Sequence, residues 1–392
     1  IYDVKTELTG NSLSLHLRRK GRVELGLTDN VGEIYEASIS ALLEDEDVAV
    51  FINNLKDIEE FNRIYREMMP NSFTQAMRQV ILNSNNMSVG AVSGQLDNLR
   101  QLIELSKPQR ARTGLWVQEL GGFYNHNDGE SEKGGSVFDF GLAMGYDAIS
   151  TDRGAFGISF AYNLADLKLN GSGENRVAME NLQVGLYHGL WLGDFFVESQ
   201  ASMGFLNFES ERDVVFDDFT RSANADWNGK QYNGNLKAGY QFKTGKISII
   251  PTVALNYNKY KLDEYTETDA GFGVNLNVDE INVKSFSSDL MLEVAHTTEF
   301  KVGDRVEATM RFDVHGGWSK EFEDNPVSLT ARFAGFDDTF SLIGDPLAPS
   351  SYQVGAGFYF TSGFTSFGIK YDARLRDGYS GHSATVNFRV RF

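Results

Sequence analysis

Asp313 and His315 come closest, in type and spacing, to a catalytic pair in this chain. Two positions apart on a strand, their side chains would project from the same face, and an Asp beside a His can activate water as a general base. However, nothing in the sequence identifies a second acidic pair that would position this water. The chain also lacks the motifs G-x-S-x-G and H-E-x-x-H, the P-loop and the dinucleotide-binding fingerprint. We therefore predict no enzyme activity, no catalytic residue and no cofactor.

Composition excludes further kinds of chemistry. The 392 residues include no cysteine, which rules out disulfides, thiolate metal sites and cysteine nucleophiles. The formal net charge of -18 repels phosphate backbones, so we expect no nucleic-acid partner. No run approaches about 18 consecutive apolar residues, which excludes a transmembrane helix. A transmembrane β-barrel stays possible, because its strands alternate between lipid-facing and lumen-facing residues.

The stretch that carries Asp313 is one of many in which apolar and polar residues alternate, from Pro108 almost to the end of the chain. Each stretch is about 10 to 14 residues long, which suits a tilted strand that crosses a membrane. The twelve stretches are roughly 114–126, 136–150, 154–168, 177–192, 194–209, 229–243, 246–262, 283–299, 304–320, 350–361, 364–376 and 381–392. They predict an all-β membrane protein, a 12-stranded antiparallel transmembrane β-barrel.

The connections between these stretches alternate between tight turns and long acidic loops, which is the asymmetry of an outer-membrane barrel. The long loops are 125–135, 209–229, 263–280 and 321–351. Within the last loop, 327–343 also alternates and would make a thirteenth strand. Because an odd count would put the two ends of the barrel on opposite sides, we assign 327–343 to a hairpin inside an extracellular loop.

Charged residues on the polar faces would line the lumen and contact a helix there. These predicted pore-lining residues are Glu119, Glu198, Lys237, Asp289, Glu293, Arg305, Glu307, Arg311, Lys370, Asp372, Arg374, Arg389 and Arg391. In a soluble sandwich the same face would be solvated, but that alternative leaves the aromatic residues on every opposite face unexplained.

The first 107 residues have a different pattern. Residues 1–27 resemble short strands, with Leu13, Leu15 and Leu17 alternating and then Val23, Leu25 and Leu27. Helical spacing follows from residue 29, and Ser72 with Gln75 predicts a capping box that opens a helix through residue 81. A further helix at about 88–106 would be about 28 Å long, and its polar surface suits the inside of a tube.

The order of these parts resembles the translocator domain of autotransporters of Gram-negative bacteria (type Va secretion). The resemblance covers residues 29–392 and rests on "NVGEIYEASISALLEDED", "VSGQLDNLRQ", "GLWVQELGGFYNH", "YQVGAGFYF" and the terminal "TVNFRVRF". It implies that residues 1–28 are the C-terminal edge of a β-helical passenger, 29–107 a helical linker with a pore helix, and 108–392 the barrel. It also implies a bacterial outer-membrane location, with the N-terminal part at the cell surface.

The resemblance implies partners and signals as well. The partners are outer-membrane lipid and lipopolysaccharide, the barrel-assembly machinery, periplasmic chaperones and the chain's own passenger, and we expect a monomer. The terminal strand would be the assembly signal, through Val386, Phe388, Val390 and Phe392. Some relatives cut themselves at an Asn pair in the pore; Asn85 and Asn86 form such a pair, but their neighbours depart from that subgroup, and we expect no cleavage.

Two rival functions stay open on the sequence. One is an outer-membrane hydrolase with Asp313 and His315 at its rim, and the other is a porin-like channel. The first residues, "IYDVKTELTG", contain neither a charged nor an apolar signal region. We therefore expect the chain to be part of a longer precursor.

Overall fold

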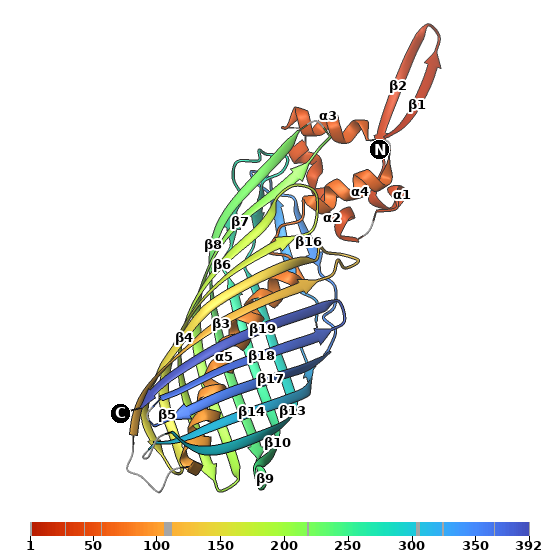
Figure 1. Ribbon diagram of the computed structural model, residues 1–392. Coiled ribbons are helices and arrows are strands. Elements are labelled where there is room, and N and C mark those ends of the chain that lie inside the picture. Colours follow the sequence, from red (N-terminus) through yellow and green to blue (C-terminus); the bar gives the residue numbers. More distant parts are fainter. Residues whose placement is uncertain are drawn as a thin grey trace.

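A closed antiparallel sheet surrounds one long helix in the computed structural model of the chain (Figure 1). The structure describes residues 2–27, 29–42, 44–55, 57–105, 112–217, 219–302, 306–323, 325–363 and 365–391. No helix among these residues is long and apolar enough to span a bilayer.

Twelve long strands form the closed sheet, and the predicted antiparallel barrel is confirmed. They are β3 (Arg112–His126), β4 (Gly135–Thr151), β5 (Gly154–Leu169), β6 (Asn175–Leu192), β7 (Phe195–Val215), β8 (Thr220–Tyr240), β10 (Ile247–Leu262), β13 (Ile281–Val302), β14 (Val306–Glu321), β17 (Ser350–Ser362), β18 (Thr365–Arg376) and β19 (Tyr379–Arg391). Each pairs with its neighbour in sequence, β10 pairs with β13, and β19 pairs with β3, so the sheet has no free edge. A three-residue strand, β9 (Phe242–Thr244), extends β8 beyond a break.

The loop 321–351 contains the predicted hairpin, which is confirmed as β15 (Ser328–Phe333) paired with β16 (Thr339–Ile343). Together with β11 (Tyr265–Thr266) and β12 (Leu276–Val278), it forms a separate four-stranded sheet. The expected loop at 209–229 is wrong for the most part. Because the β7–β8 ladder continues through Val215 opposite Thr220, most of that segment is strand.

Along each strand, side chains point alternately to the outside of the barrel and into the lumen. On β4, Phe138, Phe140 and Leu142 are exposed on the outside, whereas Asp139 and Ala143 are buried inside. Large inward side chains pack over lumen-facing glycines, which leave room for them. The ring of Trp116 lies so close to Gly145 that a Cβ there would be 2.5 Å from it.

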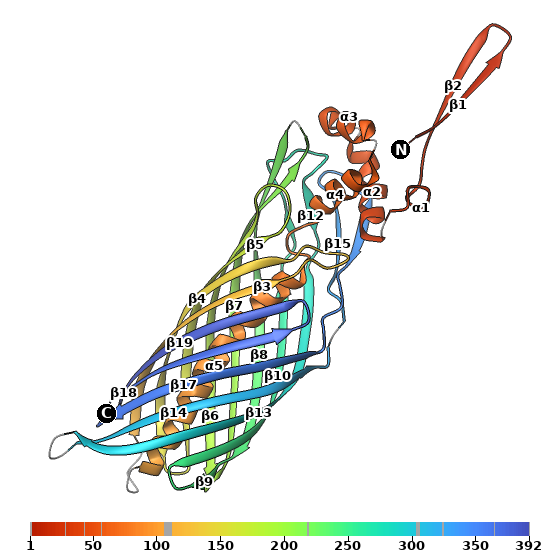
Figure 2. The same cartoon turned by 45° about the vertical axis from the view of Figure 1, so that its right-hand side comes forward.

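The N-terminal part lies beyond one end of the barrel (Figures 1 and 2). It comprises the hairpin β1 (Tyr2–Thr9) and β2 (Ser12–Arg19), then α1 (Arg22–Leu25), α2 (Asp29–Leu42), α3 (Glu46–Asn54) and α4 (Ile58–Glu67). The alternation predicted at Val23, Leu25 and Leu27 is therefore wrong. Glu24 accepts a hydrogen bond from the Gly21 amide, and Gly26 at φ 64° ends a single helical turn.

A single helix, α5 (Gln75–Leu105), replaces the two helices predicted at 72–81 and 88–106. Thr74 rather than Ser72 caps it, because its Oγ1 accepts from the Met77 amide at 3.0 Å. The polar stretch between the two predicted helices stays helical because its side chains find partners across the lumen. Asn83 accepts from the Tyr379 hydroxyl at 3.1 Å, for example.

Candidate functional site: the helix-filled lumen

The helix α5 lies off centre in the lumen. It packs on β3, β4, β5, β6 and β7, and Ala91 is fully buried against this wall. At Gly90 and Gly94 an added Cβ would meet nothing within 4 Å, so these two positions face an open space. That space is a cavity of about 290 Å³, which runs along α5 from Asn83 to Gln101 and reaches the opposite wall.

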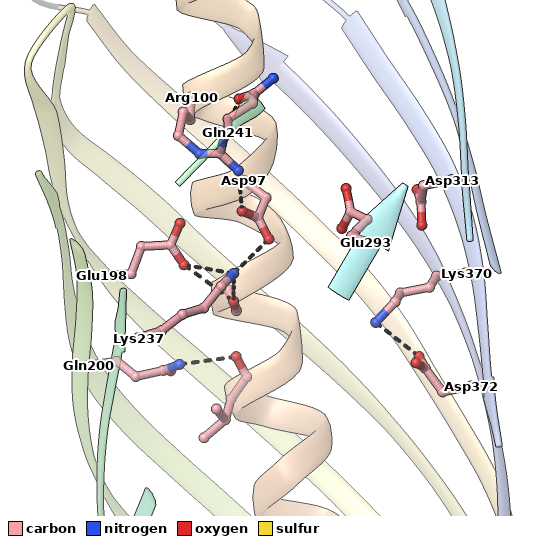
Figure 3. Close-up of polar contacts among 12 residues, drawn as sticks. Asp97, Arg100, Glu198, Gln200, Lys237, Gln241, Glu293, Asp313, Lys370 and Asp372 are labelled. Carbon is pink, nitrogen blue, oxygen red and sulfur yellow. Dashed lines mark hydrogen bonds and ion pairs between the residues drawn. The ribbon is translucent and has the colours of Figure 1, made fainter. Parts of the chain in front are cut away.

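One buried charge cluster fixes α5 to the barrel (Figure 3). Lys237 on β8 donates to Asp97 at 2.9 Å and to the Ser93 hydroxyl at 2.9 Å, and its ammonium lies 3.1 Å from Glu198 on β7. Arg100 donates to Asp97 at 2.8 Å, and its guanidinium lies over an aromatic ring of β7. Cations from α5 and β8 are therefore balanced by carboxylates from α5 and β7. We call these five residues the helix clamp.

A second cluster lines the facing wall, where Glu293 pairs with Arg311. His315 lies between two carboxylates, with its Nδ1 3.2 Å from Asp313 and its Nε2 2.7 Å from Asp372. Because both ring nitrogens are engaged, neither is available to take a proton from water. The two residues considered for a rival hydrolase are therefore in contact, with the His315 ring held between two carboxylates.

The closing strand is tied to the helix through Asp147. This fully buried carboxylate on β4 accepts from Arg389 of β19 at 2.9 Å, from Gln95 of α5 at 2.8 Å and from the Tyr187 hydroxyl at 2.7 Å. The Trp116 indole donates in turn to that hydroxyl at 3.0 Å. The seam of the barrel and the helix thus share one polar network.

The mouth on the long-loop side is closed by a buried ion pair. Arg212 on β7 is fully buried and forks onto both oxygens of Glu267. It also donates to the backbone carbonyl of Glu67, at the end of α4, at 3.0 Å. The Glu67 carboxylate accepts from the Val215 amide at 3.0 Å. The chain that leads into α5 is therefore bound to the loops on this side.

Glu132, in the loop between β3 and β4, binds the N-terminus of α5. Its carboxylate accepts from the Gln75 amide at 2.8 Å. Burial raises the pKa of Glu132 to about 8, although this hydrogen bond acts in the opposite direction. Burial also lowers the pKa of the neighbouring Lys133 to about 8. This junction contains two groups that titrate near neutral pH.

The structure places most of the predicted pore-lining residues toward the lumen. Those on lumen-facing positions are Glu198, Lys237, Asp289, Glu293, Arg311, Lys370, Asp372, Arg374 and Arg389. Arg305 lies outside the described residues. Glu307 and Arg391 lie on β14 and β19, but their side chains are outside the described part.

Glu119 is wrongly predicted, because it is exposed on the outer face of β3. Its neighbours Gln118 and Leu120 are buried in the lumen, and its cross-strand partners Leu142 and Val386 are both exposed on the outside. The strand has apolar residues on both faces, so its phase could not be read from polarity. The inward Trp116 fixes it instead, through contact with β4.

The predicted assembly signal occupies β19. Val386 and Phe388 face outward and are 38% and 47% exposed, and Val390 is half-buried. Phe392 lies outside the described residues. The Asn pair lies within α5, where Asn85 is buried and its amide donates to Asn258 at 2.5 Å.

Sequence reasoning missed the partners that α5 itself contributes. Asp97 and Arg100 are spaced three residues apart on the predicted pore helix, and this spacing of opposite charges was an available signal. Asp147 could not be found in this way, because β4 alternates so clearly that its charge needed no special explanation. Arg212 on β7 and Glu267, which directly follows β11, are 55 positions apart in the sequence, and no local pattern joins them.

Comparisons with known proteins give matches to autotransporter domains. A family model described as "Autotransporter beta-domain" matches residues 115–372. The chain is similar to the translocator domain of the autotransporter NalP from Neisseria meningitidis, with a TM-score of 0.57 and 13% identity over 79% of this chain and 98% of that one. It is also similar to the β domain of the Bordetella autotransporter BrkA, with a TM-score of 0.51 and 15% identity over 71% of this chain and 98% of that one.

Curated relatives are much longer than this chain. "Outer membrane protein A" of Rickettsia conorii is 22% identical over 329 residues, which are 80% of this chain and 16% of that protein. "Extracellular serine protease" of Serratia marcescens is 21% identical over 268 residues, 68% of this chain and 24% of that protein. The chain thus spans a quarter or less of the length of these two relatives.

Proposed function

The chain belongs to the autotransporter family, and we propose that α5 marks the path by which its N-terminal passenger reaches the cell surface. The barrel is an outer-membrane translocator for that passenger. The observation that supports the proposal is the course of α5. It passes through the lumen from the long-loop end to the short-turn end (Figure 1). Because long loops of such barrels face outward, everything before Gln75 lies on the extracellular side.

The helix clamp and the closed mouth would then retain the barrel in its state after secretion. A buried charge with its partner removed is costly, so a helix held by Lys237 and Glu198 has little tendency to leave. The chemistry is binding and burial, and we propose no catalytic step. The lumen is then sealed by α5, the segment that joins the passenger side of the chain to the barrel.

We propose that residues 1–28 are the C-terminal edge of the passenger, 29–107 the linker and 108–392 the barrel. The hairpin β1–β2 exposes a row of apolar side chains, among them Val4, Leu8 and Leu15. A two-stranded hairpin is at best marginally stable by itself, so this face suits further passenger strands. What the passenger does is a property of the whole protein.

We also propose the partners that assembly requires. The outward row Val386, Phe388 and Val390, with Phe392 after it, would be read by the barrel-assembly machinery, and periplasmic chaperones would hold the chain before insertion. The closed sheet leaves no edge for a second copy, which favours a monomer. Outer-membrane lipid, including lipopolysaccharide, would surround the apolar face.

The test is topological. An epitope placed ahead of Tyr2 should be cut by protease added to whole cells, and a tag in the short turn after β9 should be protected until the outer membrane is opened. The reverse pattern would overturn the proposal. Two further measurements address the rivals: a porin would show a wide channel in planar bilayers with α5 present, and a rim hydrolase would lose its activity in Asp313→Ala.

A further inference from the structure

Four lysines lie on three neighbouring strands, β8, β10 and β13, and the register groups them toward the long-loop end of β10. Lys230 lies on β8, Lys259 and Lys261 on β10, and Lys284 on β13. The register sets Lys261 opposite Lys230, and Lys259 opposite Lys284. Residues directly opposite in an antiparallel pair share a face, with Cβ atoms about 5 Å apart. We call these four residues the lysine patch.

The lysine patch lies on the outside of the barrel. Asn258 and Tyr260, which alternate with its β10 members, are buried in the lumen. Tyr232, Tyr257 and Phe286 share the outer face and are next to the patch in the direction of the short turns, each about 40% exposed. Aromatic residues at such positions form the girdle where a barrel leaves the hydrocarbon layer.

The distance of the lysine patch from the short-turn end of the barrel also places it at the edge of the hydrocarbon layer. Ile247 is the first exposed apolar residue of the long strand, and Lys259 lies twelve residues after it. At about 3.3 Å per residue and a tilt of about 40°, these residues rise roughly 30 Å, which is slightly more than the height of the apolar band, about 25 Å. The ammonium groups therefore lie where lipid headgroups begin, and long lysine stems can reach them.

Charge within the patch is largely uncompensated. Glu280 pairs with Lys261 at 2.6 Å, and Asp263 is the other acid acting on that lysine. In the described part of the chain, no carboxylate lies within 4.0 Å of Lys230, Lys259 or Lys284. Like charges directly opposite on a sheet repel. An arrangement of this kind is stabilised when an anion from outside the protein lies between the lysines.

The positive charge of the lysine patch contrasts with the formal net charge of the whole chain, which is -18. Elsewhere on the outer rim, Arg176 on β6 has an acidic partner, Asp166 on β5, at 2.6 Å. A surface of this charge would not attract free anions from solution. A multiply charged anion would neutralise the lysines. If it also carried acyl chains, these would lie against the aromatic girdle and hold the anion at the patch in spite of the negative net charge of the protein.

We infer that the lysine patch binds the phosphate groups of the glycolipid in the outer leaflet, the lipid A part of lipopolysaccharide. The two cross-strand pairs, which are staggered by two residues along β10, present lysines from three strands to a headgroup that carries two phosphates. The inference rests on the outer-membrane placement of the barrel and not on passenger secretion. A barrel that failed to secrete could still bind this lipid.

The test uses the full chain, purified in detergent, and the triple variant Lys230→Gln, Lys259→Gln and Lys284→Gln. The matched control removes three exposed lysines elsewhere, with Lys5→Gln, Lys246→Gln and Lys301→Gln. Native mass spectrometry would follow binding of diphosphorylated lipid A, dephosphorylated lipid A and inorganic phosphate. Each lysine near an anionic headgroup strengthens binding about fivefold, so the triple variant should bind lipid A roughly 100-fold more weakly.

We expect the control variant to match the native chain, and dephosphorylated lipid A and inorganic phosphate to bind weakly to both. Equal lipid A binding by the triple variant, or binding that ignores dephosphorylation, would overturn the inference; so would inorganic phosphate binding as tightly as lipid A. Folding is checked in lipid-free detergent, where relief of repulsion should leave the triple variant at least as stable as the native chain. A Lys→Arg triple variant keeps the charge and should retain binding, and its loss would count against the inference.

Discussion

Lys237→Met tests whether the helix clamp holds α5 in the barrel. The substitution keeps the apolar stem and removes an ammonium that contacts Asp97, Glu198 and Ser93. Glu198, which is 2% exposed, then keeps only a long contact with the Ser93 hydroxyl at 3.3 Å. Breaking a buried pair by removing one partner costs about 3 to 5 kcal/mol, and we take about 3 kcal/mol because Asp97 borders the cavity.

The loss of this interaction destabilises the state in which α5 is docked in the barrel. A loss of about 3 kcal/mol raises the population of undocked α5 by roughly 150-fold. Single-channel recording in planar bilayers reads this population directly, since an undocked helix opens the lumen. We expect long openings in Lys237→Met where the native chain shows brief and rare ones. Deletion of residues 1–107 gives the fully open reference.

Two variants control the experiment. Lys246→Met changes an exposed lysine in the turn after β9 and should leave the recording unchanged. Lys237→Met with Glu198→Gln removes the stranded charge and should recover part of the closed state. If Lys237→Met stays within twofold of the native open fraction, the clamp does not hold the helix, and packing against β3–β7 alone must do so.

The remaining predictions concern the outer face, the mouth, the terminal strand and the Asn pair. Glu119→Leu should stabilise the folded barrel in lipid by about 1 to 2 kcal/mol, because a carboxylate leaves the hydrocarbon layer; urea unfolding measures this, and a loss of stability would contradict the outward placement. The raised pKa of Glu132 means that its neutral form stabilises the folded mouth fully below its ordinary pKa and that this stabilisation is lost as the pH rises through about 8. Hydrogen exchange at the start of α5 should accelerate over that range in the native chain and stay flat in Glu132→Gln. Deleting Phe392 should lower membrane insertion more than stability, as followed by the yield of the heat-modifiable folded form; unchanged insertion would remove it from the assembly signal. Mass spectrometry of the outer-membrane fraction should give one uncut chain, and a cut between Asn85 and Asn86 would reverse the prediction of no cleavage.

The twelve strands were predictable because each has a lipid face and a lumen face of different polarity. The hairpin at 327–343 followed from parity, a global property that needs no contact information. Glu119 was misplaced for the opposite reason, since Trp116 and Leu120 make the lumen face of β3 as apolar as its outer face. Only the register with β4, which sets Trp116 over Gly145, decides which face is inside.

Continuity of α5 was beyond the sequence for a similar reason. The polar run around Asn83 and Asn85 reads as a linker, and it is helical because Tyr379 and Asn258 lie opposite. The helix clamp was half predicted, with Lys237 and Glu198 named and their helix partner Asp97 missed. Contacts between distant segments therefore account for most of what the sequence could not give.

The off-centre position of α5 has a consequence for how the barrel can be built. The strands against which α5 packs most closely, β3 to β7, are the first five after it in the chain, so the loops that close between helix and wall are short and cost little entropy. A half-formed sheet can take up the helix sideways, and the later strands then pair around a lumen that is already occupied. The helix needs no threading through a finished ring, and the side that contains the cavity is the side that closes last.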